Sequence, residues 1–182
     1  MEIEKVKWDQ IQPAPWRATH VLKPDLQVLA DSLNDYGWVS PIIVQKSTGY
    51  IIDGFHRWIC AQSDKRVLKR DKKTVPVIFK DVDAVDAMVM HVCLNRGRGQ
   101  IVAKYMSSIV KDVYHSGKYS PDEIKDIFNM SYAELTLMMD SSVIKQRKIT
   151  EYSYSTAWVP IEAPQGSAEE IIELEKPPNA DR

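Results

Sequence analysis

One short run of residues combines the groups that bind phosphate in proteins. It reads Asp-Gly-Phe-His-Arg at residues 53–57 and directly follows the apolar pair Ile51-Ile52. This pattern predicts a strand that ends at Asp-Gly and a helix that begins at once. Free N–H groups and the positive end of the helix dipole lie at such a start, where Gly54 lets a ligand approach and Arg57 can form two parallel bonds to phosphate. We therefore expect an anion site at Gly54, His56 and Arg57; the alternative is a surface arginine on an amphipathic helix.

A second candidate anion site is the run Asn95-Arg96-Gly97-Arg98-Gly99, which interrupts a helical pattern. Arginines two residues apart, with glycines between them, can direct several N–H donors at one anion. The same composition also fits an exposed basic linker. If the protein is an enzyme, Asp53 and His56 are the candidates for acid–base catalysis.

Two capping boxes mark the starts of two short helices. Ser120-Pro121-Asp122-Glu123 and Ser131-Tyr132-Ala133-Glu134 both have the S-x-x-E pattern, in which serine and glutamate each bond the other's backbone N–H. Two capped helices joined by a short turn predict a helix-turn-helix-like unit over residues 120–140. The second helix carries acidic rather than basic groups, so a unit used only for packing is the alternative. The candidate DNA contacts are Tyr132, Thr136, Lys145, Arg147 and Lys148.

The rest of the pattern predicts the elements that must hold these groups. A strand or arm is expected within 5–17, strands at 42–44, 50–52 and 74–79, and helices at 25–36, 55–63, 83–94 and 101–115. Strands early in the chain and helices later predict an α+β fold. We interpret residues 65–73 as a charged loop, with basic groups that could contact DNA phosphates. Pro76 suggests an edge strand or a bulge.

Composition limits the class of protein. The 182 residues are 44% hydrophobic and 27% charged, and no apolar run approaches the ~18 residues of a membrane helix. No apolar stretch follows a basic start, and the two cysteines match neither a disulfide framework nor a zinc motif, so we expect a cytoplasmic protein without membrane association or bound structural metal. Residues 151–182 hold seven acidic and two basic side chains, which leaves a mildly basic body compatible with a polyanionic partner.

Several of these motifs occur in the order typical of one superfamily. The run from Gly54 to Ala61 resembles the G-x-x-R-x-x-x-A box of the ParB/sulfiredoxin superfamily. Ile11 to Arg17 resembles its I-x-P-N-P segment, Leu29 to Ile42 resembles L-A-x-S-I followed by G-x-x-x-P-I, and Thr74-Val75-Pro76-Val77 resembles the strand after the box. The resemblance implies a ParB/sulfiredoxin-like nucleotide-binding domain over 1–93, a helical domain with the helix-turn-helix-like unit over 94–150, and an aromatic, then acidic tail over 151–182.

The resemblance also implies a ligand. A nucleoside triphosphate, ATP or CTP, with Mg²⁺ as a candidate counterion, would contact Ser32, Gly54, His56, Arg57, Asn95, Arg96 and Arg98. Leu94 stands where the ParB box E-N-x-x-R has the acidic residue used for metal binding and hydrolysis, which argues against CTP hydrolysis. Phe55 stands where sulfiredoxins have their catalytic cysteine, and no acidic residue lies between Ile11 and Lys23, where free-serine kinases of the superfamily have a base.

The leading hypothesis is a nucleotide-responsive ParB-like DNA-binding or regulatory protein. One alternative is an NTP-dependent enzyme (a phosphotransferase, NTPase or nuclease) acting at the same cleft. Another is an adaptor, because three aromatic residues within 152–160 favour a docking segment. That segment, together with Asn95 to Gly99 and Met130-Ser131, resembles the IbrB-like proteins of phages and mobile elements, which implies a PAPS-reductase-like partner protein.

Overall fold

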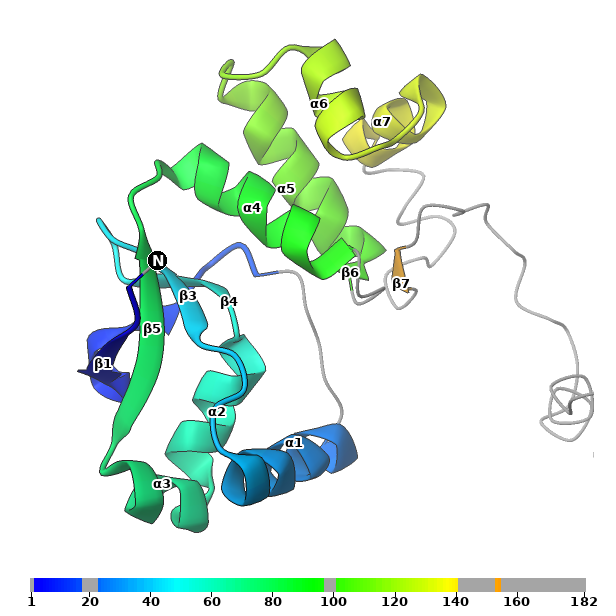
Figure 1. Ribbon diagram of the computed structural model, residues 1–182. Helices are drawn as coiled ribbons and strands as arrows, with labels where there is room; N and C mark the ends of the chain where they lie inside the picture. Colours follow the sequence, from blue (N-terminus) through cyan, green and yellow to red (C-terminus); the bar gives the residue numbers. More distant parts are fainter. Residues whose placement is uncertain (1, 18–22, 97–100, 141–152, 155–182) are drawn as a thin grey trace, which may run out of the picture.

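The computed structural model describes residues 2–17, 23–96, 101–140 and 153–154 (Figure 1). Its main sheet has five strands in the order β1-β5-β3-β4-β2. The strands are β1 (Glu4–Lys7), β2 (Gln12–Pro13), β3 (Ile42–Gln45), β4 (Tyr50–Asp53) and β5 (Thr74–Lys80). β1 is antiparallel to β5 and β3 is antiparallel to β4, whereas the β3–β5 and β2–β4 pairs are parallel.

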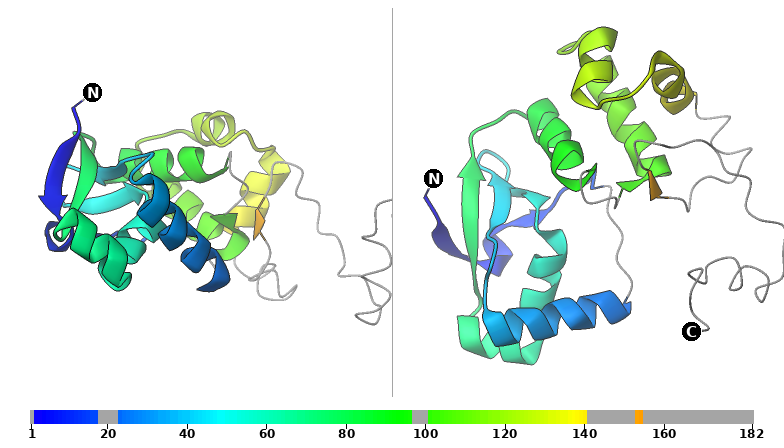
Figure 2. Two further views of the ribbon diagram at one scale, coloured as in Figure 1. Left: turned by 60° about the horizontal axis from the view of Figure 1, so that its bottom comes forward. Right: turned by 45° about the vertical axis from the view of Figure 1, so that its right-hand side comes forward.

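Seven α-helices occur within these ranges: α1 (Lys23–Tyr36), α2 (Phe55–Ser63), α3 (Lys65–Asp71), α4 (Ala84–Arg96), α5 (Ala103–His115), α6 (Pro121–Ile127) and α7 (Tyr132–Met139). A short 3-10 helix, η1 (Trp8–Gln10), joins β1 to β2, and β6 (Ile101–Val102) pairs antiparallel with β7 (Ser153–Tyr154). In Figures 1 and 2, α1–α3 lie at one end of the molecule and α4–α7 at the other. None of these helices has the length and hydrophobicity of a membrane span.

The expected combination of an early sheet and later helices is confirmed as a mixed α/β fold, but three details of the prediction were wrong. Residues 101–102, expected at the start of a helix, form β6. Residues 65–71 form α3 and not a loop, because the Asp64 carboxylate accepts from the backbone N–H groups of Arg66 and Val67 and the Val67 side chain is fully buried. Pro76 lies in β5, which is not an edge strand, because β1 is the edge strand and pairs with β5. This pairing is regular and has no bulge at Pro76.

Two apolar cores hold the fold together. One fills the space between the sheet and α1–α3, and its members include Leu33, Ile42, Ile51, Val67 and Val77. The other joins α4 to α5–α7, and its members include Val92, Met106, Ile109, Phe128 and Met138. The domain boundary predicted after residue 93 therefore falls inside α4, a helix that contributes to the helical core and also contacts β4.

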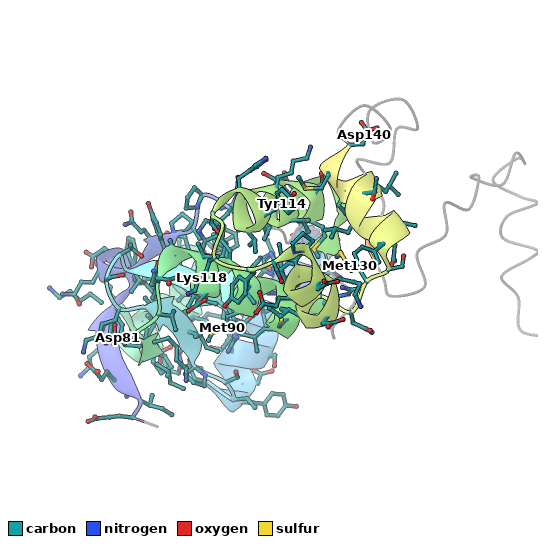
Figure 3. All side chains as sticks on the ribbon, turned by 90° about the horizontal axis from the view of Figure 1, so that it is seen from above. Asp81, Met90, Tyr114, Lys118, Met130 and Asp140 are labelled. Atoms are coloured by element: carbon teal, nitrogen blue, oxygen red, sulfur yellow. The ribbon has the colours of Figure 1, made fainter. Side chains whose placement is uncertain are left out.

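The start of α4 is attached to the segment between α5 and α6. Lys118 Nζ lies 2.5 Å from carboxylate oxygens of both Asp83 and Asp86. In Figure 3, Lys118 lies between Asp81, which follows β5, and Asp140, which follows α7. These ion pairs lower the pKa values of Asp83 and Asp86.

Both predicted capping boxes form at the starts of α6 and α7. The Ser120 N–H donates to Glu123 at 2.8 Å and the Ser131 N–H donates to Glu134 at 2.6 Å, while each serine hydroxyl accepts in return. Asn129, in the turn between the helices, has a left-handed φ of 44°. The two helices are thus started by local sequence signals and held by tertiary packing.

Candidate functional site

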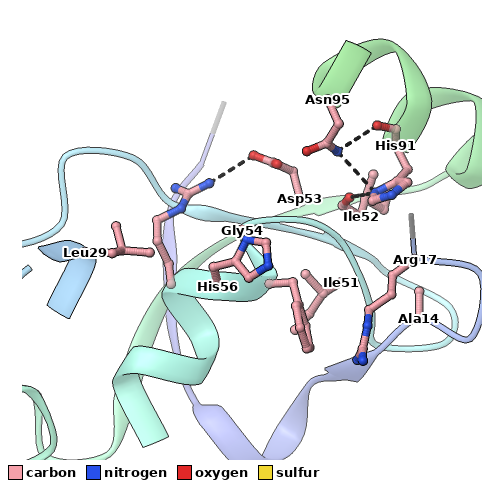
Figure 4. Close-up of a pocket in the computed structure, with 12 residues that line it drawn as sticks. Ala14, Arg17, Leu29, Ile51, Ile52, Asp53, Gly54, His56, His91 and Asn95 are labelled. Carbon is pink, nitrogen blue, oxygen red and sulfur yellow. Dashed lines mark hydrogen bonds and ion pairs between the residues drawn. The ribbon is translucent and has the colours of Figure 1, made fainter. Parts of the chain in front are cut away.

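A cleft opens where β4 ends and α2 begins (Figure 4), and its volume is about 140 Å³. It brings the Asp53–Arg57 run and Asn95 together, although they are about forty residues apart in the chain. The lining residues are Ala14, Arg17, Leu29, Ile51, Ile52, Asp53, Gly54, Phe55, His56, Arg57, His91 and Asn95. Both acid–base candidates, Asp53 and His56, are among them.

Gly54 makes the sharp turn from β4 into α2. Its φ of 92° is left-handed, and a Cβ atom there would lie 3.0 Å from Nη2 of Arg57 and 3.3 Å from Cα of Ile42. The first bond along α2 runs from the Trp58 N–H to the Gly54 carbonyl, at 3.0 Å. The amides before Trp58 have no earlier helical turn to bond, and they lie at the cleft with the positive end of the helix dipole.

Arg57 lines the cleft but is bonded within the fold. Its Nη2 lies 2.9 Å from Oδ2 of Asp53, and its Nη1 donates to the carbonyl oxygens of Ser40 and of Pro41, the latter at 2.8 Å. The two charged side chains are only 14% and 6% exposed. Arg57 therefore ties the end of β4 to the segment that enters β3, in addition to any contact with a ligand.

His91 and Asn95, one turn apart on α4, form the opposite wall of the cleft (Figure 4). His91 Nδ1 lies 2.7 Å from the carbonyl oxygen of Ile52, so Nδ1 carries the proton, because a carbonyl can only accept. Burial lowers the pKa of His91, and the bond to Ile52 and the charge of Asp53 oppose this only in part. Asn95 Nδ2 donates to the His91 carbonyl at 2.8 Å, so a neutral, oriented imidazole and an amide face one cavity.

The third wall comes from the segment after β2. The Arg17 guanidinium carbon lies 4.2 Å from the centroid of the Phe55 ring, a cation–π contact at the cleft. The neighbouring Trp16 contacts His91 edge to face, with 5.3 Å between ring centroids, and packs against the helical core. Sequence reasoning did not assign Arg17, Phe55 or His91 to the site, although Arg17 closes the motif that begins at Ile11.

Two other residues proposed for the nucleotide lie outside the cleft. Ser32 is exposed on α1 and is not among the lining residues. Arg96 donates through Nη2 to the carbonyl of Asn129 at 3.1 Å, toward the α6–α7 turn, because one residue along a helix rotates the side chain by about 100° from Asn95. Arg98 lies outside the described residues.

The proposed DNA contacts are partly described. The Tyr132 hydroxyl donates to the Asp122 carboxylate, and the Thr136 hydroxyl donates to the Tyr132 carbonyl at 2.9 Å. Both side chains are thus hydrogen-bonded within the helix pair. Lys145, Arg147 and Lys148 lie outside the described residues, as does most of segment 152–160.

Two chemical observations concern enzymatic interpretations of the site. Cys60 is 2% exposed in α2, and its burial raises the pKa of the thiol to about 11, so it fits a core position better than a nucleophilic one. Within the described ranges, no three His, Cys, Asp or Glu side chains gather as a metal site.

Comparisons with known proteins add three findings. The family model of the ParB N-terminal domain matches residues 1–95. The uncharacterized protein YbdM of Escherichia coli K12 is 26% identical over 156 residues, which cover 84% of this chain and 74% of that protein. The Pnob8-like ParB-N domain has a similar structure, with a TM-score of 0.56 at 12% identity over 82% of this chain and 74% of that one.

Weaker structural matches come from the C-terminally truncated chromosome-partitioning protein ParB of Caulobacter crescentus. Complexed to the centromeric parS site, it gives a TM-score of 0.49 at 20% identity over 78% of this chain and 75% of that chain. Complexed with CTP-gamma-S, it gives 0.43 at 18% identity over 80% of this chain and 83% of that chain.

Proposed function

The chain belongs to the ParB N-terminal domain family, and from this premise we propose that its cleft binds a nucleoside triphosphate whose occupancy regulates association with DNA. The proposed ligand is CTP or ATP. Mg²⁺ would be held mainly by the phosphates, as is usual for this ion, and not by a dedicated cage of side chains.

The observation that carries the proposal is the junction of α2, α4 and the Arg17 segment at one cleft. The start of α2 offers backbone amides and a positive dipole to phosphate, and Arg17 adds a cation at the same cavity. Asn95 and the neutral His91 offer hydrogen bonds from the opposite wall. In this proposal the phosphates lie at Gly54 and His56, and the polar side chains of α4 contact the nucleotide from the other side of the cleft.

The proposed regulation rests on the placement of α4. Its Asn95 lies at the cleft, its Val92 lies in the helical core, and its Arg96 bonds the turn between α6 and α7. A ligand that moves or fixes α4 therefore acts on the helix pair through direct contacts. In this proposal the pair is a helix-turn-helix-like unit, in which Tyr132 and Thr136 exchange their internal bonds for DNA, aided by Lys145, Arg147 and Lys148.

Two narrower proposals stand beside this one. Asp53 and His56 would act as the acid–base pair if the bound nucleotide were hydrolysed or its phosphoryl group transferred. Residues 152–160 would dock a PAPS-reductase-like enzyme if the chain were an adaptor of the IbrB-like type. Phosphate release in the presence of nucleotide, and co-purification that depends on residues 152–160, test the two in turn.

Fluorescence anisotropy with a labelled mixed-sequence duplex tests the main proposal. We expect CTP or ATP with Mg²⁺ to change the DNA affinity of the wild-type protein, and we expect Arg17→Gln to need about tenfold more nucleotide for the same change. Lys46→Gln, an exposed position in the β3–β4 turn, is the control and should respond like wild type. DNA affinity that no nucleotide changes would overturn the proposed regulation.

A further inference from the structure

Four exposed lysines lie on α3 and the turn that follows it. Lys65 and Lys69 are spaced i, i+4 and share one face of α3, Lys72 caps the end of this helix, and Lys73 comes next in the chain. We call these four residues the lysine stripe. Lys5 and Lys7 of β1 are also exposed. They pair with Pro76 and Thr74 at the start of β5, just after Lys73, and so extend the positive surface.

Three carboxylates beside α3 are already bound to arginines. Asp31 and Asp64 lie 2.6 and 2.8 Å from Nη2 of Arg66, and Asp71 lies 2.6 Å from Nη2 of Arg70. The bond from Arg66 lowers the pKa of Asp64 to about 2. Arg70 also donates to the carbonyls of Leu33 and Asn34, so the arginines attach α3 to α1.

The lysines take no part in that network. None of the four makes an ion pair with another described residue. Residues 64–73 contain six basic and two acidic side chains, and both carboxylates are engaged by arginine. The positive charge of the four lysines is therefore directed at solvent.

The turn after α3 has lysine at two positions whose backbone conformation is unfavourable for any residue with a side chain. Lys72 and Lys73 have left-handed φ angles of 51° and 64°. A non-glycine residue there costs on the order of 1 kcal/mol, and asparagine or glycine would be the easier choice. Two consecutive lysines at such positions have a local cost that no ion pair of their side chains within the described residues offsets.

We propose that the lysine stripe is a contact surface for the phosphate backbone of duplex DNA. Exposed lysines act as point charges toward phosphate without reading sequence, and they need no pocket. The proposal rests on the proposed function, which supplies DNA as the polyanion. It adds a second, sequence-independent phosphate contact at the end of the molecule opposite α6 and α7 (Figures 1 and 2).

Charge distinguishes the two ends as DNA surfaces. Residues 120–140 contain five acidic side chains and one basic side chain, Lys125, which lies 2.5 Å from Asp126. The acidic groups weaken the attraction of the helix pair for DNA phosphates, so contacts of Tyr132 and Thr136 need added positive charge elsewhere, which the lysine stripe supplies. A membrane is the less fitting partner, because surface-bound helices insert apolar residues beside their lysines, whereas Val67 of α3 lies in the core and Leu68 is half-buried.

The test compares two charge-matched double variants in anisotropy titrations between about 50 and 200 mM salt. Lys72→Asn/Lys73→Asn removes two charges from the stripe and places asparagine at the left-handed positions. Lys23→Gln/Lys46→Gln removes two exposed charges elsewhere; the Lys46 N–H bonds the Lys80 carbonyl, at the end of β5 far from Lys73.

We expect the stripe variant to bind DNA about tenfold more weakly at low salt, with a salt slope shallower by about 0.9 for each phosphate that a lysine no longer neutralises. Its thermal midpoint should equal or exceed that of wild type, and its nucleotide affinity should be unchanged, which excludes a structural explanation. The control should keep the affinity and the slope of wild type. Lys65→Gln/Lys69→Gln should repeat the weaker binding.

Three outcomes would overturn the assignment. Equal DNA binding by wild type and both stripe variants would remove the stripe from the DNA surface and leave the proposed function intact. No DNA binding by the wild type at any salt concentration would instead contradict the DNA part of the proposed function, and the stripe assignment with it. Stripe-dependent sedimentation with phosphatidylglycerol vesicles, without a DNA effect, would identify a membrane surface.

Discussion

The guanidinium of Arg57 and the carboxylate of Asp53 form a buried ion pair at the floor of the cleft, with 2.9 Å between Nη2 and Oδ2. The pair closes one turn of chain across Gly54, and Arg57 also donates to the carbonyls of Ser40 and Pro41. The residue with the clearest phosphate-binding signature is thus also a structural residue. A loss of ligand binding in an Arg57 variant would report on the fold as much as on a phosphate contact.

We predict that Arg57→Ala lowers the free energy of unfolding by about 3 kcal/mol, because it leaves the Asp53 carboxylate buried without its partner. The double variant Asp53→Asn/Arg57→Gln should be less destabilised than Arg57→Ala, since no buried charge remains. Urea unfolding followed by circular dichroism measures both. A double variant that is no more stable than Arg57→Ala would show that the carbonyl contacts, and not the ion pair, dominate.

Gly54→Ala should destabilise the protein more than Gly117→Ala does. Both glycines are left-handed, with φ of 92° and 67°, so each substitution costs about 1–2 kcal/mol in backbone strain. Only at Gly54 does the new Cβ also meet Arg57 and the backbone of Ile42, whereas nothing lies within 4 Å at Gly117. Equal losses of thermal stability in the two variants would mean that the cleft relaxes around an added methyl group.

Stability should fall as the pH drops below about 6.5 because of His91. Its pKa in the folded protein is lowered from the ordinary 6.5, so the unfolded chain takes up the proton first and is favoured as the pH falls. His91→Asn should flatten the pH dependence of the unfolding free energy between about pH 6.5 and 5. The pKa of Asp64 is lowered from its ordinary 3.8, so its protonation changes the stability only below about pH 3.8, outside this window. An unchanged slope in His91→Asn would contradict the assignment.

The Ser131 cap should contribute measurably to the helix pair. Ser131→Ala removes the hydroxyl that accepts from the Glu134 N–H at 3.2 Å, and we expect a loss of about 1 kcal/mol. Ser32→Ala, at an exposed position within α1, should change the unfolding free energy by less than about 0.5 kcal/mol. If both variants unfold at the same urea concentration, the box does not stabilise α7.

Local signals in the sequence were sufficient for the parts of the fold that depend on neighbours along the chain. The capping boxes at Ser120 and Ser131, the Asp-Gly turn before α2 and the apolar strands all form where their residues predict them. α3 was missed because six of the ten residues at 64–73 are basic, and of its two apolar residues only Val67 is fully buried while Leu68 is half-buried.

The site needed tertiary information. Residue types placed Arg57 and Asn95 at one cleft, but the engagement of Arg57 by Ser40 and Pro41 depends on how the entry to β3 lies beside α2. His91 was invisible because its role comes from a bond to β4, thirty-nine residues earlier in the chain. Its spacing of one helical turn from Asn95 is the signal that could have identified it.

Calorimetric titration of CTP, ATP and GTP with Mg²⁺ tests the central claim most directly. We predict that the wild-type protein binds one of these nucleotides at a single site, that Arg17→Gln weakens this binding by about tenfold (~1.4 kcal/mol), and that Lys46→Gln leaves it unchanged. Arg17 is the better probe than Arg57, because no described ion pair depends on it. No binding of any nucleotide by the folded wild-type protein, or equal binding by Arg17→Gln, would contradict the account.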